Sequence, residues 1–165
     1  MKIQPIRTAA TILAAGLALL PHRAFAAPTC NSVQVSPSVL ATSLVFGIYS
    51  AGSASPTLSN STVTVSCSNT NYKLPSFTVA LSAGGAGGFN PRKMSSSGSN
   101  LNYNMYIDST YTTIWGDGTS GTATQSYNGS LGLNQVLFTN YGRVPASQFV
   151  KAGGYTDTIT VTVTY

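Results

Sequence analysis

The last eight residues, 158–165, read TITVTVTY and decide the fold. Apolar and hydroxyl side chains alternate there with a period of two, which is the pattern of a β-strand with one face buried. The segment therefore predicts an amphipathic strand at the end of the chain. Its apolar face comprises Ile159, Val161, Val163 and Tyr165.

The same alternation recurs upstream and predicts further half-buried strands. The clearest are residues 62–67 (TVTVSC), 77–81 (FTVAL) and 101–107 (LNYNMYI). Weaker candidates, each interrupted or flanked by Gly, Asn or Pro, are residues 44–49, 121–127 and 135–141.

Two stretches between the strands are rich in turn residues. Residues 83–100 contain many Gly and Ser residues and predict a long surface connection that carries Arg92 and Lys93. Residues 115–121, WGDGTSG, are typical of a turn. Outside the N-terminal segment no stretch has helical periodicity over three turns. The pattern predicts an all-β domain, an antiparallel β-sandwich of immunoglobulin-like type with roughly six or seven strands.

The N-terminal segment has the features of a signal peptide. Lys2 and Arg7 precede an apolar run from residue 9 to residue 20, and Ala24-Phe25-Ala26 matches a small-x-small cleavage site. We predict that residues 1–26 are removed on export and that residues 27–165 form one domain. The apolar run is shorter than the roughly 20 residues that a membrane-spanning helix needs, so we expect a secreted protein that does not span a membrane.

Two cysteines, Cys30 and Cys67, remain after cleavage, with 36 residues between them. Export places them in an oxidising compartment, where a disulfide is the expected state. The bond would join the first strand, expected at residues 30–35, to the strand that ends at Cys67, and closing this loop stabilises a fold by about 4 kcal/mol. A metal or redox pair would need further ligands or CxxC spacing, which the sequence lacks.

Charged residues are scarce, and this limits the chemistry of the domain. Removal of the leader takes away Lys2, Arg7, Arg23 and the single histidine, His22, and lowers the net charge from +5 to +2. A charge this small gives no support to nucleic-acid binding. The remaining acids are three aspartates, of which Asp117 and Asp157 lie in turn contexts. Without histidine or paired carboxylates we predict no catalytic site, cofactor or metal. These acids are Asp108, Asp117 and Asp157.

A terminal strand with a continuous apolar face has two interpretations. In the first, the sandwich lacks one strand, and its open groove accepts a strand from another protein. In the second, the sandwich is complete and its last strand simply ends the chain. The residues alone give the two interpretations about equal weight.

Seven segments, in this order, give the chain a family resemblance. They are Cys30, GIY at 47–49, the strand ending at Cys67, LNYNMY at 101–106, WGDGT at 115–119, YGRVPA at 141–146 and GYTDTITVTVTY at 154–165. With this ordered set the chain resembles the spore coat protein U domain family, whose members include the subunits of archaic chaperone-usher pili.

The resemblance implies an incomplete immunoglobulin-like pilin that is completed by donor-strand complementation. A periplasmic chaperone, an outer-membrane usher and neighbouring pilin subunits would be its partners. Its place would be the cell surface, in a fimbrium that serves adhesion and biofilm formation, or in a coat. The donor-strand groove would be formed by Ile159, Val161, Val163 and Tyr165.

Two features bear on a position at the fibre tip. Only three residues would precede Cys30 after cleavage, about 10 Å of chain, which is too short to donate a strand to a neighbour. The subunit would then accept a strand without donating one. Three aromatic side chains, Tyr111, Trp115 and Tyr127, are candidates for a recognition surface on which an adhesive tip module would bind carbohydrate or abiotic surfaces, although burial is the commoner state of such residues.

Overall fold

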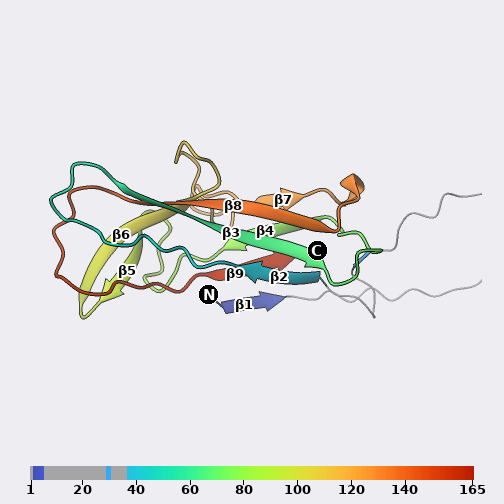
Figure 1. Ribbon diagram of the computed structural model, residues 1–165, viewed down its shortest axis with the longest axis horizontal. Helices are drawn as coiled ribbons and strands as arrows, with labels where there is room; N and C mark the ends of the chain where they lie inside the picture. Colours follow the sequence, from blue (N-terminus) through green and yellow to red (C-terminus); the bar gives the residue numbers. More distant parts are fainter. Residues whose placement is uncertain (1, 6–28, 31–36) are drawn as a thin grey trace, which may run out of the picture.

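The computed structural model describes residues 2–5, 29–30 and 37–165 of the chain. They form an antiparallel β-sandwich in which the two sheets face one another along the long axis of the molecule (Figure 1). The elements are β1 (Lys2–Pro5), β2 (Pro37–Ala41), β3 (Thr57–Cys67), β4 (Phe77–Leu81), β5 (Arg92–Ser96), β6 (Ser99–Tyr106), β7 (Gln125–Tyr127), the short 3-10 helix η1 (Gly129–Leu131), β8 (Gln135–Val144) and β9 (Thr160–Thr164).

One sheet has the strand order β1-β9-β4-β7 and the other has the order β2-β3-β8-β6-β5. All strand pairs are antiparallel except β1 with β9, which is parallel. The all-β sandwich predicted from the alternation is confirmed, and the five strands β3, β4, β6, β8 and β9 lie where the sequence placed them, with boundaries shifted by a few residues.

The core is built from the alternating positions. Val63 and Val65 of β3 face Val79 and Leu81 of β4 across the sandwich, and Val161 of β9 belongs to the same buried cluster. Their hydroxyl-bearing neighbours along each strand point outward, because successive side chains of a strand lie on opposite faces. The period of two is thus the direct cause of the two-layer packing.

The predicted disulfide is present. Cys30 and Cys67 are bonded, with 5.8 Å between their Cα atoms, and both side chains are buried. Cys30 is held by a backbone hydrogen bond from its N–H to the carbonyl of Lys73. The strand expected at residues 30–35 lies outside the described residues, apart from Cys30 itself.

The prediction of a long surface connection over residues 83–100 holds for residues 83–91, which join β4 to β5, and is wrong for residues 92–100. The segment contains β5, which pairs with β6 through a two-residue turn at Ser97 and Gly98. Both turn residues have positive φ, 43° and 81°, as a type I′ hairpin requires. Arg92, expected at the surface, is fully buried.

Candidate functional site

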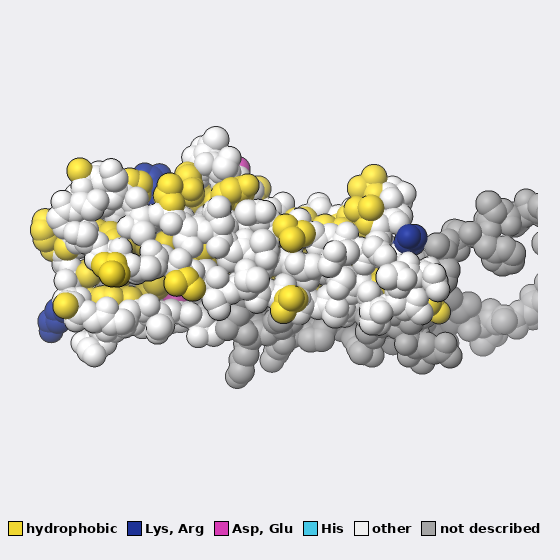
Figure 2. All heavy atoms as spheres, in the orientation of Figure 1, with side chains coloured by type: hydrophobic (Ala, Val, Ile, Leu, Met, Phe, Trp, Pro, Cys, Tyr) yellow, Lys and Arg dark blue, Asp and Glu magenta, His cyan; other side chains and the backbone are white. Residues whose placement is uncertain are grey.

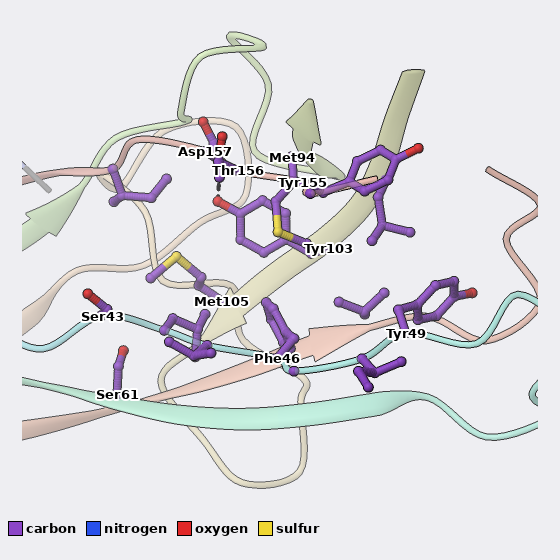
Figure 3. A pocket seen from close by; sticks show the side chains of 18 of the residues that line it. Ser43, Phe46, Tyr49, Ser61, Met94, Tyr103, Met105, Tyr155, Thr156 and Asp157 are labelled. Carbon is purple, nitrogen blue, oxygen red and sulfur yellow. Dashed lines mark hydrogen bonds between the residues drawn. The ribbon is translucent and has the colours of Figure 1, made fainter. Parts of the chain in front are cut away.

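A large groove of about 830 Å³ opens between the two sheets at the end of the molecule that carries β5 and β6. One wall is the segment 42–51, which follows β2, and the other is the segment 150–157, which precedes β9. Side chains of Met105, Tyr103 and Phe46 line the space between the walls (Figure 3). The lining is mostly apolar, and hydrophobic side chains are exposed on this end of the molecule (Figure 2).

Both walls leave backbone donors without backbone partners. In the described part of the chain, no hydrogen bond starts from the N–H groups of residues 43–48 or of residues 149–155. Residues 44–49, a weak strand candidate in the sequence, form no strand and join no sheet, and Gly47 among them has a positive φ of 71°. Two facing segments with free backbone N–H groups and an apolar space between them have the properties of a missing strand position.

The first wall is held by close packing on β8. A side chain at Gly142 would clash, since an ideal Cβ there would lie 2.7 Å from Leu44 Cδ2 and 2.9 Å from Phe46 Cζ. Phe46 also packs edge-on against Tyr103 of β6, with 6.0 Å between ring centroids. Gly142 therefore gives Leu44 and Phe46 the room to lie against β8.

The second wall is fixed by Asp157. Its Oδ2 accepts a hydrogen bond of 2.7 Å from the Tyr103 hydroxyl, and its Oδ1 accepts from the backbone N–H of Gly85 at 2.8 Å. Burial and the hydrogen bond to Asp157 both raise the pKa of Tyr103, so its phenol stays neutral. Asp157 thus joins the wall to β6 and to the turn that follows β4.

Arg92 anchors the end of the sandwich next to the groove. Its guanidinium donates to the carbonyl oxygens of Ser82 and Trp115, at 2.8 and 2.7 Å, and to Asn104 Oδ1 at 2.9 Å. It also lies 5.2 Å from the centre of the Phe89 ring. Desolvation by burial lowers the pKa of Arg92 from its usual value. One buried side chain therefore ties β5, β6 and two connecting segments together.

The four residues predicted to receive a donor strand lie on β9 or next to it. Ile159 lines the groove, whereas Val161 and Val163 are buried deeper in the core with 0% and 1% exposure. Tyr165 lies beyond β9 and packs against Phe77, with 6.4 Å between ring centroids. Sequence reasoning found this strand and gave residues 44–49 as a weak strand candidate, but it did not predict that segments 42–51 and 150–157 form the walls of a groove.

The outer edge of β9 is not free along its whole length. β1 pairs with it in parallel, from Lys2 opposite Thr160 to Pro5 opposite Val163 (Figure 1). The expectation of an uncovered terminal strand is therefore not met in the full chain. Any extended segment nearby can satisfy such an edge, and here residues of the predicted leader do so.

The three aromatic residues suggested as a recognition surface do not come together. Trp115 is fully buried, and its Nε1 donates to the carbonyl of Val79 at 3.0 Å. Tyr127 is also buried and packs on Phe77, with 5.3 Å between ring centroids. Only Tyr111 is partly exposed. The shared platform is therefore absent, because two of its members complete the core.

Of the two aspartates predicted to be turn formers, Asp117 accepts hydrogen bonds within a turn, whereas Asp157 lies in no turn and instead accepts hydrogen bonds from Tyr103 and Gly85. Asp108 accepts hydrogen bonds from the backbone N–H groups of Thr110, Thr112 and Thr113, and Asp117 accepts from that of Thr119. Within residues 2–5, 29–30 and 37–165, no three His, Cys, Asp or Glu side chains gather into a possible metal site. The same residues include no helix of the length and apolarity that crossing a membrane requires.

The turn at Asp108 gives a pH-dependent prediction. Hydrogen bonds, first of all from the Thr110 hydroxyl, lower the pKa of Asp108 well below its usual value. The charged form therefore stabilises the fold above the unfolded-state pKa of about 3.9, and this contribution is lost as pH falls towards the folded-state pKa. We expect Asp108→Asn to be less stable than the unaltered protein at pH 7, and the difference to shrink below about pH 4. Urea unfolding at both pH values measures it, and an equal difference throughout would contradict the assignment.

Comparisons with known proteins identify the family and a similar fold. The family model described as Spore Coat Protein U domain matches residues 17–162. No curated protein sequence matches the chain. Among solved structures, the chain is similar to one in the CsuC-CsuE chaperone-tip adhesion subunit pre-assembly complex from archaic chaperone-usher Csu pili of Acinetobacter baumannii, with a TM-score of 0.53 and 24% identity. The match covers 79% of this chain but only 40% of the other.

Proposed function

Because the chain belongs to the Spore Coat Protein U domain family, we propose that it is a structural subunit of a secreted surface fibre or coat, assembled by donor-strand complementation. The groove carries the proposal. Its two walls offer unpaired backbone N–H groups on either side of an apolar space, which an extended segment with alternating apolar side chains would fill and pair with. No catalytic role is proposed, since the family and the fold are those of structural subunits.

The edge of β9 also supports the proposal, because it already pairs with a strand added from elsewhere in the chain. This strand, β1, belongs to the segment that the sequence predicts to be a signal peptide. Cleavage after Ala26 would remove β1 and free the edge of β9 from Thr160 to Val163. The groove and the freed edge would then form one longer acceptor site. Mass spectrometry of the exported protein tests this, since it should begin at Ala27.

The partners follow from the same site. We propose that a periplasmic chaperone fills the groove before assembly, that an outer-membrane usher receives the complex, and that a neighbouring pilin subunit replaces the chaperone strand. The similar structure contains a chaperone bound to a tip adhesion subunit, in keeping with such partners. We further propose that the subunit lies at the tip of the fibre. A labelled antibody against this subunit that binds only at fibre ends would support a tip position.

Strand capture is the direct test of this function. We expect the exported protein, purified alone, to aggregate, and a synthetic peptide with alternating valine and threonine to bind it and raise its melting temperature by several degrees. A peptide of the same composition in scrambled order is the control. A stable monomer that ignores both peptides would contradict the proposal.

A matched pair of variants locates the captured strand. Val45 lines the groove and is 69% exposed, whereas Leu137 is 57% exposed on β8 and is not part of the groove lining. Because both side chains are already exposed, lysine at either position should leave the fold intact. We expect Val45→Lys to weaken peptide binding about tenfold and Leu137→Lys to leave it unchanged.

A further inference from the structure

Ser61 of β3 and Asn140 of β8 form a polar pair in the apolar groove. The two residues lie directly opposite each other in the sheet, and Asn140 Nδ2 donates a hydrogen bond of 2.8 Å to Ser61 Oγ. Both are buried, with exposures of 7% and 0%, and both line the groove. Figure 3 shows the Ser61 side chain pointing from its strand into the cavity.

The pair is incompletely satisfied. Asn140 Oδ1 is buried and has no hydrogen-bond partner. Since Ser61 Oγ accepts from Asn140, the hydroxyl hydrogen of Ser61 is available for donation. Rotating the amide by 180° would exchange the roles of its two ends but would still leave one of them unpaired. A buried amide in this state is costly, and most such groups in native proteins have a partner.

We infer that this pair forms hydrogen bonds with one side chain of the inserted strand and thereby fixes the register of that strand in the groove. The inference rests on the proposed function. The side chain facing the pair would both donate and accept a hydrogen bond, as serine, threonine, asparagine and glutamine can. It donates to Asn140 Oδ1 and accepts from the Ser61 hydroxyl. The inserted strand is therefore an alternating apolar segment with one polar side chain on its inward face.

Register specificity follows from the period of a strand. Residues on one face recur every second position, so a strand that slips by two residues still presents apolar side chains to the groove. Such a slip would move the polar side chain against apolar lining such as Met105 or Ile159 and leave Asn140 unpaired. A single buried polar contact selects register in other assemblies in the same way.

A peptide scan tests the inference on the exported protein. Starting from an alternating peptide with valine at every inward position, each inward valine is replaced in turn by threonine, which has nearly the same shape. Binding is measured by calorimetry. We expect threonine at one position to bind about tenfold more tightly than threonine at the other inward positions, where its hydroxyl is buried without a partner.

A double variant supplies the second arm. In Ser61→Ala/Asn140→Leu the polar pair is replaced by apolar groups, and the favoured position should behave like the others. Equal affinities of the threonine peptides for the unaltered protein would overturn the inference, because a water molecule would then satisfy Asn140. This outcome is measured on the unaltered protein, so it does not depend on whether the double variant folds. Failure of every peptide to bind would instead overturn the proposed function.

Discussion

Replacing Arg92 by methionine should lower the free energy of unfolding by roughly 4 kcal/mol, an effect far larger than a surface arginine would give. The side chain is fully buried and supplies donors to Ser82 O, Trp115 O and Asn104 Oδ1. Methionine fills part of the volume and removes the cost of burying a cation, but it leaves the carbonyl oxygens of Ser82 and Trp115 unpaired, while Asn104 Oδ1 keeps the backbone N–H of Met105. The loss of hydrogen bonds should dominate, because each buried acceptor left unpaired costs about 1 to 3 kcal/mol.

The neighbouring residue provides the control for Arg92. Lys93 is on the same strand with its side chain partly exposed, so Lys93→Met should change stability by no more than about 0.5 kcal/mol. Arg92→Lys keeps the charge but cannot reach all three acceptors, and it should recover only a small part of the loss. Urea unfolding followed by the fluorescence of Trp115, the single tryptophan, measures all three variants. Equal stability of Arg92→Met and Lys93→Met would refute the role of Arg92 as an anchor.

The strands that the sequence predicted most clearly are those in which apolar residues alternate strictly with hydroxyl-bearing ones. In residues 62–67 and 158–165 every second residue is apolar, and the structure buries those positions in β3 and β9. β5 escaped detection because its inward positions hold Arg92 and Met94 among serines. A buried arginine is satisfied by carbonyl groups from distant segments, and no local pattern indicates them.

The groove was only partly predictable for the same reason. The alternation in the terminal strand predicted an apolar face. The walls at 42–51 and 150–157, however, are defined by backbone N–H groups that lack hydrogen-bond partners. Whether a backbone group has a partner depends on the whole sheet order. Gly142 was the available signal, since a glycine inside a strand often marks the close approach of another segment, here Leu44 and Phe46.

Burial of Trp115 makes its substitution a test of structure rather than of recognition. We expect Trp115→Ala to destabilise the protein by about 4 kcal/mol, since it leaves a large cavity beside Phe138 and removes the indole hydrogen bond to Val79. Trp115→Phe should cost less, because the ring volume is partly kept and mainly the hydrogen bond is lost. Urea unfolding followed by circular dichroism measures both variants, since neither retains the tryptophan.

Tyr111 separates the structural role of Trp115 from a role in adhesion. It is the partly exposed member of the three aromatic residues. Its ring packs on Tyr106 of β6 and Tyr141 of β8, in the sheet of order β2-β3-β8-β6-β5. Tyr111→Ala should therefore keep the fold, with a cost of about 1 kcal/mol. If Trp115→Ala abolished binding to a surface while unfolding at the same urea concentration as the unaltered protein, Trp115 would have to reach the surface, and its place in the core would be wrong. Because the indole is buried, we expect any loss of binding in Trp115→Ala to be accompanied by a loss of stability of the fold.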